Sequence, residues 1–174
     1  MPNEPLASLS RETLIKLLEA YSRNWKSLDA LWFGAVEAES GLDTAVRLDL
    51  DNWRVQAVSE ARRLKEALAL TETGPAAVLK VLSFMTWQLT SDLFEYEMDT
   101  PDRAVIRYRT CAVQEGRTRA DKPTFPCKEM KLTLLSSIAS VVDPAVKVSC
   151  LSGPPDPPGA GYWCRWELTV TAPL

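Results

Sequence analysis

A proline- and glycine-rich stretch near the C-terminal end constrains the fold most strongly. Residues 153–161 read Gly-Pro-Pro-Asp-Pro-Pro-Gly-Ala-Gly, which excludes a helix or an inner strand, because proline lacks a backbone N–H and glycine lacks a side chain to pack. Apolar and polar residues alternate over residues 146–150 and 164–170, as in half-buried strands. We therefore predict two neighbouring strands joined by a stiff loop at the rim of a pocket, with Cys150 and Cys164 on the inner face.

The composition fits one globular domain, residues 1–174. Of the 174 residues, 46% are hydrophobic and 25% are charged, which is enough for a substantial core. The formal net charge of −3 disfavours a nucleic-acid partner, because such a partner requires a basic face. The N-terminal residues do not resemble a signal peptide, and no apolar run approaches the ~18 residues of a membrane span. We expect a cytoplasmic protein with no membrane partner, and a homo-oligomer remains open.

The N-terminal half is predicted to consist of helices. Ser10 is the expected cap of a long amphipathic helix that ends near Gly41, because apolar residues recur at three- and four-residue steps between them. Asp43 is expected to cap a short helix, and Asp51 a longer one. A further helix is predicted over residues 74–82, because proline is tolerated in a first helical turn.

A hairpin is predicted to follow these helices. Residues 87–98 indicate one long strand whose apolar phase slips near Ser91 and Asp92, as at a β-bulge. A turn over residues 99–102 returns the chain as a second strand with Ala104, Ile106 and Tyr108 inward. On the outer face, acidic residues of the first strand are expected to pair with arginines of the second.

The remaining segments complete an α+β fold. Residues 111–122 are polar and are expected to form a helical turn or loop, and residues 127–142 a helix stopped by Asp-Pro. We therefore predict a helical half, about residues 8–83, packed on an antiparallel sheet of about four strands with one further helix, about residues 84–174.

The four cysteines are candidate thiols or metal ligands. They are Cys111, Cys127, Cys150 and Cys164. No Cys-x-x-Cys pair occurs and the chain has no histidine, so we expect no cofactor and no imidazole chemistry. Buried thiols, a metal or cluster site and a reactive thiol all remain open. Cys111 is the candidate for an exposed reactive thiol, because Arg109 and Arg117 lie near it in sequence.

Glu60 and Asp29 are candidates for acid–base catalysis. Glu60 falls inside the apolar stripe of its predicted helix, and Asp29 is expected to be half-buried among aromatic residues of the first helix. Burial beside aromatic rings raises the pKa of a carboxyl group and suits it to proton transfer. A buried ion pair between Glu60 and Arg63, or a tie between helices, is the structural alternative.

Other side chains are candidates for binding a ligand between the helical half and the sheet. The aromatic set is Trp25, Trp32, Trp53 and Trp163. These rings suit a flat ligand, although packing in the core is the alternative. Arg63 and Arg117 are expected to hold a carboxylate, and Gln114 is a further candidate.

Motifs over nearly the whole chain match those of a known family. They include Leu28-Asp29-Ala30-Leu31-Trp32-Phe33, Glu60-Ala61-Arg62-Arg63, Phe125-Pro126-Cys127-Lys128, Cys150-Leu151-Ser152-Gly153-Pro154-Pro155-Asp156 and Trp163-Cys164-Arg165-Trp166-Glu167. They resemble an uncharacterised bacterial family classed as a domain of unknown function. In that family a cysteine precedes the Pro-Pro-Asp and a histidine follows it. Gly153 and Pro158 stand at these positions here, which argues against metal binding.

A more distant similarity concerns the cysteines. The spacing of Cys111, Cys127 and Cys164-x-Trp166 is similar to that of proteins labelled L-2-amino-thiazoline-4-carboxylic acid hydrolase, which open a small sulfur heterocycle. This resemblance implies a hydrolase acting on C–N or C–S bonds of a small cyclic amino-acid-like or carboxylate-bearing substrate. Glu60 and Asp29 would then transfer protons, and Cys111 would take part as a thiol. The alternative is a non-catalytic ligand- or metal-binding module that uses the same pocket.

Overall fold

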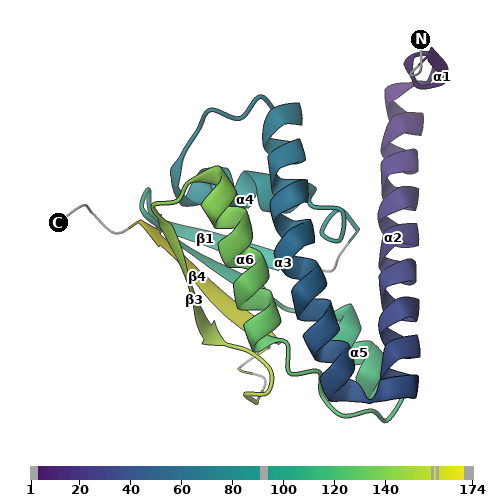
Figure 1. The fold of residues 1–174 in the computed structure, drawn as a ribbon. Coiled ribbons are helices and arrows are strands. Elements are labelled where there is room, and N and C mark those ends of the chain that lie inside the picture. The colour runs from purple at the N-terminus through teal and green to yellow at the C-terminus, as the bar shows by residue number, and fades with distance from the viewer. Residues whose placement is uncertain (1–3, 91–93, 158, 160, 171–174) are drawn as a thin grey trace.

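A four-stranded antiparallel sheet packed against helices makes up the fold, as predicted (Figure 1). The computed structural model describes residues 4–90, 94–157, 159 and 161–170. The elements in chain order are α1 (Glu4–Ala7), α2 (Arg11–Ser40), α3 (Leu42–Ala67), α4 (Gly74–Phe84), β1 (Phe94–Thr100), β2 (Arg103–Tyr108), α5 (Ala112–Arg119), α6 (Lys128–Val142), β3 (Val146–Ser152) and β4 (Cys164–Val170). No helix in these described ranges is long and apolar enough to cross a membrane.

The helices α2 and α3 form a long antiparallel hairpin along one side of the molecule (Figure 1). The Ser10 hydroxyl caps α2 by accepting the N–H of Thr13, as predicted. The helix ends at Gly41, whose φ of 83° suits glycine. The predicted helix boundary at Asp51 is wrong, because α3 is continuous. Asp51 lies inside it, 3.2 Å from the guanidinium of Arg54 one turn later.

The sheet has the strand order β1-β2-β4-β3, and α4 and α6 cover its inner face while α3 packs on α6. The predicted inner face of β2 is confirmed, since Ala104, Ile106 and Tyr108 are buried, but Val105 on the opposite face is buried as well. Trp166 and Leu168 of β4 are completely buried in the same core. On the outer face, Glu95 and Glu97 pair with Arg109 and Arg107, as expected for cross-strand charges.

The predicted start of the first strand is wrong. Residues 85–90 form a turn after α4, in which the N–H of Gln88 bonds the carbonyl of Met85 at 2.8 Å. The strand β1 begins only at Phe94. Met85 and Gln88 are buried in this turn, so the apolar pattern there reflects burial of a turn. The predicted bulge at Ser91 and Asp92 lies outside the described residues.

Candidate functional site

Four segments meet at one end of the sheet and bring three cysteines and one lysine together. Tyr108 ends β2 and lies in register with Cys164, the first residue of β4. Cys111 is the N-cap residue of α5, and Cys127 is that of α6. Lys131 follows one turn later on α6, so both strands and both helices contribute to the cluster. We call these residues the Lys131 cluster.

The amine of Lys131 lies against two aromatic rings. Its Nζ is 3.7 Å from the ring centre of Trp87 and 4.4 Å from that of Tyr108, within the range of cation–π attraction. Burial of the amine lowers the pKa of Lys131 to about 8, although part of the side chain is exposed, and the nearby cysteines oppose this shift. Near neutral pH, a substantial fraction of the amine is therefore uncharged.

The thiols of the cluster stay protonated. Burial raises the pKa of Cys127 to about 12, and the neighbouring Cys111 and Cys164 add to the effect. Burial also raises the pKa of Cys111 and of Cys164. Cys111 is half-buried, so the prediction that it is the exposed cysteine is wrong. Cys150, opposite Trp166 in the sheet, is half-buried as well, and its pKa is also raised by burial.

Gln114 holds the cysteine-bearing segments in place. This buried side chain donates to the carbonyl of Phe125 at 2.7 Å and accepts the N–H of Phe125 at 3.0 Å. Its Nε2 also lies 3.6 Å from the Cys127 sulfur. The carboxylate of Glu115 accepts the N–H of Cys111 at 3.1 Å. Gln114 therefore uses both ends of its amide to position the Lys131 cluster.

Arg117 is already paired with a carboxylate of the protein. Its guanidinium bonds both oxygens of Glu37 on α2, at 3.1 and 2.8 Å, and also the carbonyl of Pro123. This pairing, together with Lys122, lowers the pKa of Glu37. Because Arg117 is only 7% exposed, the pair anchors α5 to α2. The expectation that Arg117 holds a substrate carboxylate is therefore not supported by this geometry.

Glu60 is buried inside the apolar stripe of α3, as predicted, at 6% exposure. Its carboxylate accepts the backbone N–H of Thr86 and lies 3.5 Å from the Gln56 amide nitrogen. Arg63 is exposed, so the Glu60–Arg63 ion pair considered as an alternative does not form. Glu60 instead fixes the residue directly before Trp87, and thereby one wall of the Lys131 cluster.

Asp29 is exposed, and the prediction that it is half-buried is wrong. The more perturbed carboxyl group belongs to Asp49 on α3. Burial raises the pKa of Asp49 to about 7, the charge of Asp29 adds to this, and a hydrogen bond from Trp53 opposes it. The pKa of Asp29 is also raised by the burial that it has. Sequence reasoning missed Asp49, although its position one helical turn before Trp53 predicts a contact between these two side chains.

The predicted aromatic set divides in two. Trp25 and Trp53 meet edge to face with ring centres 5.4 Å apart, and Trp53 contacts Trp87 at 6.4 Å, so this row leads to Lys131. Trp32 is 65% exposed and lies outside the row. Trp163 is half-buried, and its backbone N–H donates to the Tyr108 carbonyl at 2.8 Å. The sequence signal that would have found the cluster is Lys131, which lies one turn after Cys127 on the apolar stripe of its helix.

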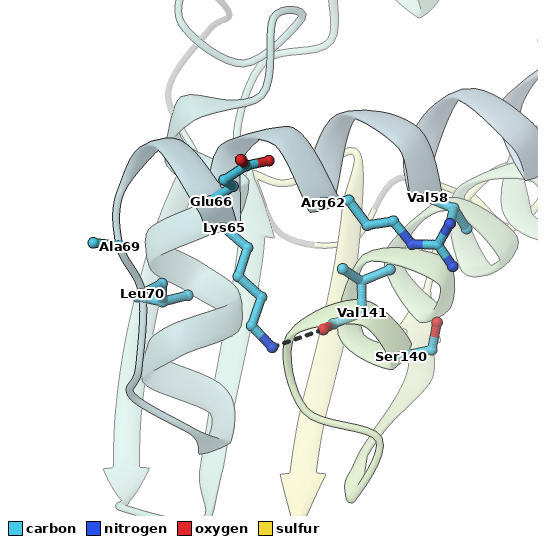
Figure 2. A pocket seen from close by; sticks show the side chains of 8 residues that line it. All are labelled: Val58, Arg62, Lys65, Glu66, Ala69, Leu70, Ser140 and Val141. Atoms are coloured by element: carbon cyan, nitrogen blue, oxygen red, sulfur yellow. Dashed lines mark hydrogen bonds between the residues drawn. The ribbon is translucent and has the colours of Figure 1, made fainter.

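Two hollows lie elsewhere on the molecule. A groove of about 730 Å³ lies between the C-terminal ends of α3 and α6, and Figure 2 shows the side chains that line it. It is lined by Val58, Arg62, Lys65, Glu66, Ala69, Leu70, Ser140 and Val141. The Lys65 amine caps α6 there through the carbonyls of Val141 and Val142, at 3.0 Å each. A smaller hollow of about 390 Å³ lies between α4 and β1. None of the predicted site residues lines either hollow.

The metal prediction concerned the four cysteines. In the part of the chain that the structure describes, no group of three or more cysteine, aspartate or glutamate side chains is placed to hold one metal ion. The chain lacks histidine altogether. The cluster thus presents protonated thiols around the Lys131 amine.

Comparisons with known proteins place the chain in a family. A search of curated proteins and a search of solved structures each found no match. One family model, described as "Family of unknown function (DUF6125)", matches residues 7–170. This match includes both strands, both helices and every side chain of the Lys131 cluster. The chain therefore belongs to the DUF6125 family.

Proposed function

We propose that the protein is a small-molecule enzyme whose reacting group is the Lys131 amine. The observation that carries this proposal is the burial of the Lys131 amine, whose Nζ lies between the rings of Trp87 and Tyr108 at 3.7 and 4.4 Å from their centres. A lysine amine held away from water is easily deprotonated, which is how lysine serves as a general base. With a pKa of about 8, roughly a fifth of the amine is neutral at pH 7.4.

The second group of the proposed site is the buried hydroxyl of Tyr108, whose ring lies beside the Lys131 amine. Tyr108 is only 7% exposed, and its hydroxyl has no hydrogen-bond partner within the described residues. Burial raises the pKa of Tyr108 well above its ordinary value, so the hydroxyl stays protonated and can donate. A buried donor without a partner is costly, and a bound acceptor such as a carboxylate would satisfy it.

The reaction class that suits these groups is hydrolysis of a C–N or C–S bond in a small carboxylate-bearing ring compound. The neutral Lys131 amine accepts a proton from water as the water oxygen bonds to the ring carbon. When the C–N or C–S bond breaks, the Lys131 ammonium returns this proton to the leaving nitrogen or sulfur. The amine is regenerated, and the protonated thiols keep its surroundings free of negative charge.

Turnover of a panel of thiazoline and thiazolidine carboxylates tests the proposal. Lys131→Met should lower the rate at least about 100-fold, the usual contribution of general-base catalysis. The wild-type rate should rise with pH through about 8, where the Lys131 amine loses its proton. Lys128→Met is the matched control, since Lys128 lies on the same helix but pairs with Asp156 at 2.7 Å.

A measurement without substrate follows the same group. The pH dependence of amine modification, read at Lys131 by mass spectrometry, should show a midpoint near 8. A midpoint near the ordinary lysine value of about 10.4 would remove the basis of the proposal. Turnover that survives in Lys131→Met would assign catalysis to another group.

A non-catalytic ligand-binding module is the second candidate. The unpartnered Tyr108 hydroxyl favours it as much as it favours catalysis, because binding alone would satisfy that donor. In that case, carboxylate compounds should raise the melting temperature of the wild type without being consumed. The rise should be smaller in Tyr108→Phe, which keeps the ring and removes the donor.

A further inference from the structure

One flank of α2 carries large apolar side chains that remain mostly exposed among the residues that the structure describes. Ser22, on the other flank, is almost completely buried and donates a 2.5 Å hydrogen bond to the Thr86 carbonyl. The uncovered residues are Leu18 at 56% exposure, Tyr21 at 63%, Leu28 at 68%, Leu31 at 73% and Trp32 at 65%. Figure 1 shows α2 at the edge of the molecule, with α3 on one side of it.

These five residues form one stripe. At about 100° per residue they fall within an arc of about 140°, beside the flank that carries Ser22. Trp25 lies toward the Ser22 side of this arc and packs on Trp53 of α3. From Leu18 to Trp32 the stripe runs roughly 21 Å along the helix. A stripe of this kind is the pattern of a helix that packs on another helix. We call it the α2 stripe.

The α2 stripe is large enough for a protein interface. With ~100–150 Å² of exposed surface for each side chain, it offers roughly 600 Å². This equals the largest apolar patches usually seen on monomers, which tend to mark interaction sites. Two copies packed together would bury about 1,200 Å², the lower end of stable specific interfaces.

The charges at the two ends of α2 favour a second copy in antiparallel orientation. Arg11 begins the helix and Glu39 lies near its end, both are exposed, and neither has an ion-pair partner in the described ranges. If the two-fold axis passes at Trp25, Arg11 of one copy lies opposite Glu39 of the other. The same register places Leu18 opposite Trp32. The helix dipoles also run antiparallel, which is favourable.

We propose that the α2 stripe is the interface of a symmetric dimer in which α2 packs antiparallel against α2 of a second copy of this chain. Such an interface is isologous, so each Arg11–Glu39 contact occurs twice. The interface does not include the Lys131 cluster and does not depend on the proposed function.

Sedimentation velocity on the full chain tests the dimer. The wild type should sediment at twice the chain mass of 19.4 kDa at micromolar concentration. Leu28→Lys, which places a charge in the centre of the stripe, should raise the dimer dissociation constant at least tenfold. Val113→Lys is the matched control, because Val113 is 54% exposed on α5, and it should leave the dimer unchanged. Thermal melts followed by circular dichroism verify that both variants are folded.

Charge reversal tests the antiparallel register. Arg11→Glu and Glu39→Arg should each weaken the dimer several-fold, and the double variant should recover it, because each contact then pairs opposite charges again. A dimer that the double variant fails to restore would overturn the register. A monomeric wild type at about 100 μM would overturn the dimer. A monomer that co-sediments with phosphatidylcholine and phosphatidylglycerol vesicles would instead assign the stripe to a lipid surface.

Discussion

The helix α2 and the sheet layer differ sharply in how they are held. Of the 30 residues of α2, only Ser22 is buried, whereas α4 buries six of its 11 residues. The helix α2 is attached by two aromatic contacts, Trp25 with Trp53 and Phe33 with Phe125, and by polar contacts. Ser22 and Lys26 bond carbonyls of the turn after α4, and Glu37 pairs with Arg117. Burial therefore determines how the sheet layer packs, while helix capping, local ion pairs and a few contacts with other elements position α2.

The largest expected difference concerns two tryptophans. Trp166 of β4 is completely buried, and Trp32 of α2 is 65% exposed. Trp166→Ala removes packed core and leaves a cavity, so it should lower the free energy of unfolding by about 3–5 kcal/mol. Trp32→Ala should change it by less than about 0.5 kcal/mol at submicromolar concentration. Urea unfolding measures both, and similar losses would contradict the division between the two regions.

Sequence patterns predicted the sheet layer better than the position of α2. Alternation identified the inward residues of both central strands correctly, because these side chains face the core, although Val105 on the other face of β2 is buried too. On α2, the wheel position of Asp29 gave a direction, toward Asp49 of α3, but not how much of the side chain stays exposed. Asp29 was therefore predicted half-buried and is exposed. Asp51 is a cap residue by type, yet nothing interrupts the helix beside it.

The candidate site was predictable only in part. The burial of Glu60 followed from the helical stripe, and the three cysteines of the cluster had been noted individually. Their convergence on Lys131 depends on strand order and on the packing of α6, which the spacing of cysteines does not contain. Trp87 was assigned to a strand that does not extend to it. Its place beside Lys131 depends on the turn after α4, which Glu60 fixes.

The second prediction removes the ion pair between Arg117 of α5 and Glu37 of α2. Arg117→Ala leaves the Glu37 carboxylate, whose side chain is 14% exposed, with only Lys122 as a partner. The variant should lower the free energy of unfolding by about 2–4 kcal/mol, since removing one member of a buried pair strands the other. Arg23→Ala is the control on the same helix, where an exposed pair with Glu19 contributes less than about 0.5 kcal/mol.

The contribution of the Glu37–Arg117 ion pair to stability depends on pH with a definite sign. Because the folded protein lowers the pKa of Glu37, the pair contributes stability above the unfolded pKa, and that contribution is lost as the pH falls through the folded value. The difference between wild type and Arg117→Ala should therefore shrink on acidification. A difference that stays constant down to pH 3 would show that the loss comes from packing and not from the charge pair.

The smallest expected effect concerns Asp49 on α3, in the helical hairpin of α2 and α3. Its pKa is about 7 in the folded protein against 3.8 ordinarily, so the folded state binds more protons between these values. Stability should therefore fall as the pH rises from about 4 to 7, and the cost is complete above 7. Asp49→Asn removes the charge and should stabilise the protein by about 1–2 kcal/mol at pH 8, after allowance for its partial exposure.

Urea unfolding at pH 5 and pH 8 separates this effect from other consequences of the substitution. The gain from Asp49→Asn should be full at pH 8 and only about a third as large at pH 5, because the cost of burying the charge accumulates between the unfolded pKa of 3.8 and the folded pKa of about 7. Asp51→Asn is the control, because Asp51 is exposed on the same helix and pairs with Arg54. It should change stability little at either pH. Because the charge of Asp29 contributes to the raised pKa of Asp49, Asp29→Asn should reproduce part of the gain at pH 8. Equal gains at both pH values would show that Asp49 acts through packing against α2 rather than through its charge.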